Sequence, residues 1–256
     1  MASSSASNLI TQAHAEGLLS SAGLQSLTSV DFGSSIQAGL GLSVDDVYAA
    51  DAVLVSLLID DSGSIASAGH ADLVREGHNL VLDALQGARQ RDAVLAHTRY
   101  LNGTILYPYS LLPNCPRMDR ANYDPNGGTP LYDQAAVLLG TVVAKAQDFA
   151  ASGIPTRSVS LIITDGDDVH SRHHTPKSVA AIVRDLFAAE THIVAGMGID
   201  DGSTDFRAVF RSMGIPDQWI LTPSAGPEDI RRAFQMFSRS AVRAGQSSAT
   251  LGGFAG

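Results

Sequence analysis

One apolar run constrains the fold of this chain more than any other feature. Val53–Ile59 is rich in Val, Leu and Ile and is followed at once by the polar sequence DDSGS. Such a run is typical of a strand that is buried on both faces of a parallel sheet. The carboxyl ends of such strands are where open α/β folds bind ligands. The sequence thus predicts a central strand whose end presents Asp60, Ser62 and Ser64, three oxygen donors suited to Mg²⁺, Mn²⁺ or Ca²⁺.

Strand and helix patterns alternate along most of the remaining chain. The other expected strands are 92–100, 104–107, 157–164, 191–198 and 218–221. The expected helices are 72–85, 131–151, 176–189, 205–213 and 228–242. Such alternation favours a doubly wound, mostly parallel α/β sheet with helices on both faces. The turn signal at Asn102-Gly103 predicts a hairpin, so we expect six strands with one antiparallel strand at the edge.

The chain divides by composition into a main domain and two flanking segments. Residues 1–50 are rich in Ser, Ala and Gly, and all their Asp, Glu, Lys and Arg charges are acidic. We expect an extension that is partly helical or loosely ordered, with short helices near Leu9–Leu19 and at 44–50. It would either pad the outside of the main domain, 51–243, or dock a partner. Residues 244–256 read as a flexible, Gly/Ser-rich tail.

Overall composition excludes some partners and favours a compartment. The net charge of -9 argues against a nucleic-acid or anionic-membrane surface. Cys115 is the single cysteine, so no disulfide can form within the chain. The first residues lack the basic and apolar regions of a secretion signal, and no apolar run approaches the roughly 20 residues of a membrane span. We therefore expect a cytoplasmic protein.

Three loops fall at the same end of the predicted sheet and together predict a metal site. They contain Asp60–Ser64, Gly127–Pro130 and Asp165–Asp168. Their candidate ligands are side-chain oxygens, with Mg²⁺ as the expected ion and Mn²⁺ or Ca²⁺ as alternatives: Asp60, Ser62, Ser64, Thr129 and Asp165. Because three of these donors are neutral hydroxyls, a bound ion would stay electropositive. An Asp or Glu of another protein would suit an open coordination position.

The motifs DxSxS, GGTPLYD and ITDGDD resemble the metal-ion-dependent adhesion site (MIDAS) of the von Willebrand factor type A (vWA) domain family. The resemblance covers about 51–243 and implies a Rossmann-like sheet of about six strands. It implies that Ser62, Ser64 and Thr129 bind the ion directly or nearly so, and that Asp60 and Asp165 often act through water. GGTPLYD and TDGDD look more like intracellular prokaryotic members, which often work with AAA+ ATPases.

Other polar residues near these motifs have simpler interpretations. We expect Asp61, Asp167 and Asp168 to be solvated loop carboxylates that add negative potential, and Asp133 to complement a helix dipole. His170, His173 and His174 suggest zinc, but a solvated loop is the better interpretation because the chain has one thiol. Cys115 has no evident base beside it, and Trp219 is expected in the core.

The leading functional hypothesis is a metal-dependent protein-interaction module rather than an enzyme. One alternative is an assembly subunit that docks through residues 1–50. The other is a metal-dependent hydrolase or phosphotransferase, since Asp60-Asp61 at a strand end superficially fits aspartyl-phosphate chemistry. That chemistry needs a Lys or Arg near the phosphoryl group, and the three loops have none. The sequence also lacks a P-loop and a Gly-x-Ser-x-Gly motif.

Overall fold

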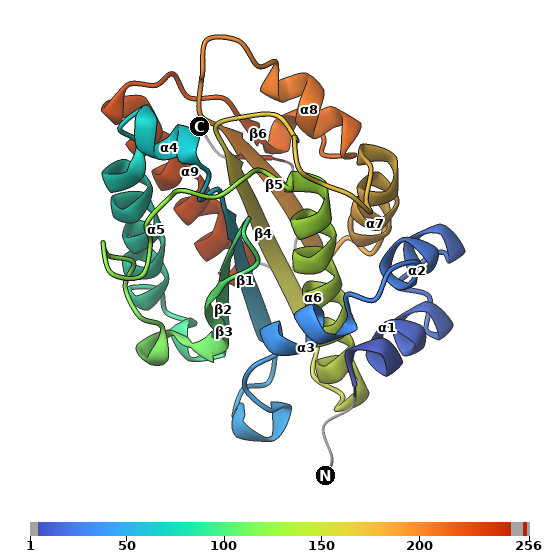
Figure 1. The fold of residues 1–256 in the computed structure, drawn as a ribbon. Coiled ribbons are helices and arrows are strands. Elements are labelled where there is room, and N and C mark those ends of the chain that lie inside the picture. Colours follow the sequence, from blue (N-terminus) through green and yellow to red (C-terminus); the bar gives the residue numbers. More distant parts are fainter. Residues whose placement is uncertain (1–4, 247–252, 255–256) are drawn as a thin grey trace.

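A six-stranded sheet runs through the centre of the computed structural model, which describes residues 5–246 and 253–254 (Figure 1). The strand order is β3-β2-β1-β4-β5-β6, and every neighbouring pair is parallel except β2 with β3. The strands are β1 (Ala52–Ile59), β2 (Val94–Tyr100), β3 (Ile105–Leu111), β4 (Thr156–Thr164), β5 (His192–Gly198) and β6 (Ile220–Leu221). The predicted class, the strand number and the antiparallel edge strand are confirmed.

Strand β1 lies between β2 and β4, as its apolar sequence predicts. All eight of its residues are buried. Its last residue, Ile59, pairs with Tyr100 on one side and Ile163 on the other. The chain reverses order at β1, because β2 and β3 extend the sheet one way and β4 to β6 the other. The end of β1 is therefore the topological switch point where such sheets bind ligands.

Helices cover both faces of the sheet. They are α4 (Gly63–Ser67), α5 (Ala71–Gln86), α6 (Leu131–Ala151), α7 (Pro176–Ala188), α8 (Phe206–Ser212) and α9 (Pro227–Gln246). Figure 1 shows α5 beside α9, and these two pack against each other, while α6 and α7 lie on the opposite face. Most residues of α6 are buried, which suits a helix that is apolar on nearly all sides. No helix within the described residues is both long and apolar enough to cross a membrane.

The N-terminal segment forms three helices that pack on α6 and α7. They are α1 (Ala6–Ala15), α2 (Ser21–Thr28) and α3 (Gly33–Gly39). The first lies in the region where a helix was expected, whereas periodicity did not predict α2 or α3. Ile36 of α3 and Leu27 of α2 pack over Gly140 of α6, where a Cβ would lie 2.7 Å from the Cδ1 of Ile36. A glycine at this point lets the short helices approach α6 closely.

Several element boundaries differ from the sequence prediction. The helix expected at 44–50 is only a 3₁₀ turn, Val44–Asp46, and β3 continues to Leu111 into the expected loop. Helix α9 continues to Gln246, while 247–252 and 255–256 of the expected flexible tail lie outside the described residues. Phe254 contacts the ring of Trp219, which is buried as expected.

We predict that the N-terminal helices contribute to the stability of the whole chain. Ile36 is 1% exposed, and Ile36→Ala should lower the free energy of unfolding by about 2–5 kcal/mol because it leaves a cavity beside Gly140. Chemical denaturation would measure this loss. Ser34→Ala, at an exposed site of the same helix, is the matched control. A loss below about 1 kcal/mol for Ile36→Ala would mean that the N-terminal helices cover the surface of the domain without stabilising it.

Candidate metal site

The Asp60 carboxylate joins the ends of β1 and β4. Asp60 is fully buried, and its Oδ1 accepts the backbone N–H of Ser62 at 2.8 Å. Its Oδ2 accepts the hydroxyl of Thr164 at 2.7 Å. The phenol of Tyr123 donates to the carbonyl of Asp60. These contacts hold the carboxylate in one orientation at the start of the first predicted metal loop.

A chain of hydroxyls connects the first loop to the third. The Oγ atoms of Ser62 and Ser64 are 2.8 Å apart, and Ser64 donates to Oδ1 of Asp165 at 2.6 Å. Because the Ser64 proton goes to Asp165, Ser62 donates to Ser64. The structure thus brings four of the five predicted ligand residues, Asp60 included, into one hydrogen-bonded group.

Backbone pairing brings Thr129 to the same edge. Gly127 forms an isolated parallel bridge with Ser62, in which its N–H donates to Asp61 at 2.9 Å and its carbonyl accepts from Gly63 at 3.1 Å. The third loop continues without regular structure to His174. The Thr129 carbonyl accepts the N–H of Val169, in this loop, at 3.1 Å. Thr129 is 7% exposed, and its hydroxyl has no hydrogen-bond partner among the described residues. The second loop is therefore tied to both others, with a hydroxyl available to a ligand.

The ring of His170 supports the Thr129 loop. The backbone N–H of Thr129 donates to Nδ1 of His170 at 2.9 Å, so Nδ1 is unprotonated and Nε2 carries the hydrogen. A Cβ on Gly128 would lie 2.7 Å from the same Nδ1. The second glycine of GGTP is thus needed to admit the imidazole. Sequence reasoning placed His170 in a solvated loop and missed this contact, although the ring is exposed as expected.

Asp61 is a structural residue of the site, and the expectation that it is solvated is wrong. Its side chain is buried, and Oδ1 accepts the N–H of Asn102 in the β2–β3 turn at 3.0 Å. Burial, helped by the charge of Asp60, raises the pKa of the Asp61 carboxyl to about 6. Asp61 therefore fixes the hairpin beside the first loop. Asp167 is exposed as expected.

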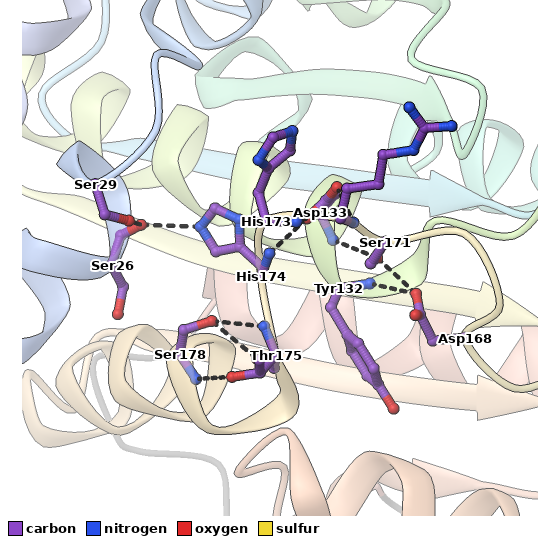
Figure 2. Close-up of polar contacts among 11 residues, drawn as sticks. Ser26, Ser29, Tyr132, Asp133, Asp168, Ser171, His173, His174, Thr175 and Ser178 are labelled. Carbon is purple, nitrogen blue, oxygen red and sulfur yellow. Dashed lines mark hydrogen bonds and ion pairs between the residues drawn. The ribbon is translucent and has the colours of Figure 1, made fainter.

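Asp133 organises the end of the third loop, a role beyond the expected helix-dipole effect (Figure 2). It lies in the first turn of α6 and is buried. Its carboxylate accepts the backbone N–H groups of Arg172, His173 and His174 at 2.9, 3.1 and 2.7 Å. The neighbouring Asp168 accepts the N–H of Tyr132 and the hydroxyl of Ser171, so it too serves the helix start.

His174 links this loop to the N-terminal helices, which corrects its assignment to a solvated loop. It is 5% exposed, and its Nε2 donates to the carbonyl of Ser26 in α2 at 2.9 Å. The ring of Phe32 lies 5.3 Å away. His173 stays exposed as expected. The described residues contain no group of three or more His, Cys, Asp or Glu side chains that could hold a metal, so the zinc interpretation gains no support.

Sequence reasoning missed two residues that position Asp60. Thr164 donates to it from the end of β4, and the order Thr164-Asp165 at a strand end is a signal that was available. Tyr123 comes from a long loop without periodicity, and Arg75 donates to its backbone carbonyl. No sequence pattern indicates that Tyr123 lies beside Asp60.

The donor set fits a divalent cation. Burial, with the charges of Asp60 and Asp201, raises the pKa of the Asp165 carboxyl to about 6, while the Ser64 hydroxyl lowers it. Within the described part of the chain, no Lys, Arg or His forms an ion pair with Asp60, Asp61 or Asp165. Buried carboxylates gathered with hydroxyls and lacking a counter-ion are what a hard cation stabilises.

Comparison with known proteins identifies the fold. The structure matches the vWF domain of the pilus tip protein Mfa5 from Porphyromonas gingivalis, with a TM-score of 0.53, 12% identity and coverage of 80% of this chain and 99% of that one. The chain has the von Willebrand factor type A fold. Manganese-loaded TRAP of Plasmodium vivax gives a TM-score of 0.50 and 17% identity, covering 76% and 75%.

A third match is the mussel byssus matrix protein PTMP1 with a zinc-occupied MIDAS motif. The TM-score is 0.52 at 13% identity, covering 77% of this chain. The chain spans only 47% of the length of PTMP1. No protein-family model matches the sequence, and no curated protein matches it at a significant level. The comparisons therefore establish the fold.

We predict that Asp133→Asn loosens the third loop. The amide can accept from fewer backbone N–H groups and places its own NH₂ against the others, so stability should fall by about 1–3 kcal/mol. Hydrogen exchange of residues 172–174 should become faster. Asp167→Asn, at an exposed carboxylate of the same loop, should change neither quantity. Unchanged exchange in Asp133→Asn would contradict this role.

Proposed function

We propose that this chain is a metal-dependent protein-interaction module. The main supporting observation is the hydrogen-bonded group of Asp60, Ser62, Ser64 and Asp165, of which Asp60, Ser62 and Asp165 are buried and Ser64 is exposed. Within the described residues, neither carboxylate of this group has a cationic partner. These residues and Thr129 would hold Mg²⁺, with Mn²⁺ or Ca²⁺ as alternatives. A bound ion would supply an electropositive centre for an acidic side chain of a partner protein. The zinc-occupied MIDAS motif of PTMP1 and the manganese-loaded state of TRAP support the choice of a divalent cation.

The surface over the site supports access by a partner. Gly63 follows Ser62 and Gly166 follows Asp165, and a Cβ at either position would meet no atom within 4 Å. Neither glycine has a positive φ. The two loops thus present bare backbone to open space directly beside the proposed ligands. A protruding Asp or Glu side chain can approach there without displacing side chains of this protein.

We also propose that the protein works in the cytoplasm of a prokaryote, where an AAA+ ATPase would be a candidate partner. The support for this setting is the resemblance of GGTPLYD and TDGDD to intracellular members of the vWA family. The proposal also includes the absence of catalysis, which is supported by the lack of Lys and Arg in the three loops. Turnover of para-nitrophenyl phosphate that Asp60→Asn abolishes would overturn this part.

Assembly through the N-terminal segment is the second candidate function. Tyr48 is 97% exposed. Tyr48 and Val169 are the two large hydrophobic residues that are exposed in the described part of the chain. The apolar residues of α1 to α3 are already buried against α6 and α7, so Tyr48 is the better docking point within residues 1–50. This function predicts that partner capture survives chelation and fails in Tyr48→Ala.

We predict that divalent cations stabilise the protein through these five residues. At a Mg²⁺ or Mn²⁺ concentration of 100 times the dissociation constant, the free energy of unfolding should rise by about 2.7 kcal/mol. Ser64→Ala and Asp165→Ala should each lower the affinity for the ion at least tenfold in calorimetric titration, because each removes one oxygen donor. Asp46→Asn, at an exposed carboxylate outside the three loops, is the control and should bind the ion like wild type. Wild-type protein that shows no heat and no shift in melting temperature with Mg²⁺, Mn²⁺ or Ca²⁺ would remove the metal site.

We predict that partner binding needs both the ion and the open surface. Proteins captured in Mg²⁺ should be released by EDTA and absent with Asp165→Ala. Gly166→Leu should bind Mg²⁺ within about threefold of wild type, because its side chain enters open space, yet capture at least tenfold less partner. Capture that is the same in EDTA and with Gly166→Leu would show that the partner docks elsewhere.

A further inference from the structure

Arg99 is a buried cation that has no counter-charge among the residues that the structure describes. It lies on β2, is 1% exposed, and carries five N–H donors. Within the described residues, its side chain forms one hydrogen bond, from Nη2 to the carbonyl of Gly103, and this bond is long at 3.5 Å. Its Nε and Nη1 are buried and have no acceptor among the described residues, and none of the carboxylates described there pairs with it. A buried, unpaired charge is strongly destabilising, so this arrangement needs an explanation.

A second unpartnered group borders the same turn. The Oε1 of Gln134, in α6, is buried and has no hydrogen-bond partner in the described structure. A Cβ on Gly103 would lie 3.7 Å from Nε2 and 4.0 Å from Oε1 of this amide. Rotating the amide by 180° exchanges these two atoms and turns its N–H toward the position of the oxygen. Arg99 and Gln134 therefore flank Gly103 from β2 and from the start of α6.

The surrounding charges favour an anion over water at this point. Burial lowers the pKa of Arg99 to about 10, and no carboxylate of the described residues offsets this shift. His97, two residues earlier, has its pKa lowered to about 3 by burial and by the Arg99 charge, so it is neutral near pH 7. Lys145, also on α6, is paired with Asp148. Water would accept from Nε and Nη1 but would leave the positive charge uncompensated.

We propose that Arg99 and Gln134 bind a small monovalent anion, of the size of chloride, between the β2–β3 turn and the start of α6. Nε and Nη1 of Arg99 donate to it, and the turned amide of Gln134 adds a third donor. The anion would neutralise the buried guanidinium that contacts Gly103, in the same β2–β3 turn whose Asn102 N–H donates to Asp61. The site would therefore stabilise the hairpin that supports the first metal loop. It does not depend on the proposed metal-binding function.

The test compares chloride with a bulky anion at constant ionic strength. The full chain is melted in 0.2 M sodium chloride and in 0.2 M sodium gluconate, with EDTA present so that metal binding does not contribute. We expect a melting temperature several degrees higher in chloride. Crystals soaked in bromide should show anomalous density beside Arg99. Equal melting temperatures, or water density without bromide at this position, would overturn the proposal.

Two variants assign the effect to this site. Arg99→Met, which keeps the length of the side chain without charge, should abolish the difference between chloride and gluconate. Arg211→Gln, at an exposed arginine paired with Asp217, should retain it. If Arg99→Met does not fold, Gln134→Leu should reduce the difference, and the bromide experiment on wild type needs no variant. A chloride effect that persists in the folded Arg99→Met, or that is undiminished in Gln134→Leu, would overturn the assignment.

Discussion

The hydrogen bond from Thr164 to Asp60 is the contact on which the candidate site depends. It crosses between the two central strands, and the other Asp60 oxygen holds the turn that begins at Ser62. With Asp60 fixed, Ser64 reaches Asp165, and Gly127 pairs with the backbone beside Ser62. Three segments far apart in the sequence are thus oriented from one buried carboxylate. The buried parallel sheet makes this possible because its strands end at one edge.

Patterns of apolar and polar residues predicted the sheet well because the central strands are buried on both faces. Val53–Ile59 could hardly form another element, and the polar residues after it had to lie at the sheet edge. The same logic correctly brought the Asp165 loop beside the first, since β4 is the neighbour of β1. Thr129 was placed by its motif, and the backbone pairing of Gly127 accounts for its position.

Contacts between side chains and distant backbone could not be predicted in this way. The position of Asp133 in the first turn of a helix predicted only an interaction with the helix dipole. Its three N–H partners come from a loop about 40 residues later. His174 and Tyr123 were likewise missed because irregular loops bring them to their partners. Helices α2 and α3 are short and have few apolar residues, so their periodicity is weak. Tertiary packing against α6 stabilises them instead.

The position of α6 limits how the molecule can change shape. The sheet packs on one side of this helix and the N-terminal helices pack on the other. Sliding α6 along its axis would break both interfaces together, including the fit of Ile36 over Gly140. Helix α9 has no such second layer in the described structure, since its main contacts are with α5, β1 and β4. A displacement of the loops at the sheet edge would therefore disturb fewer interfaces if it moved α9 than if it moved α6.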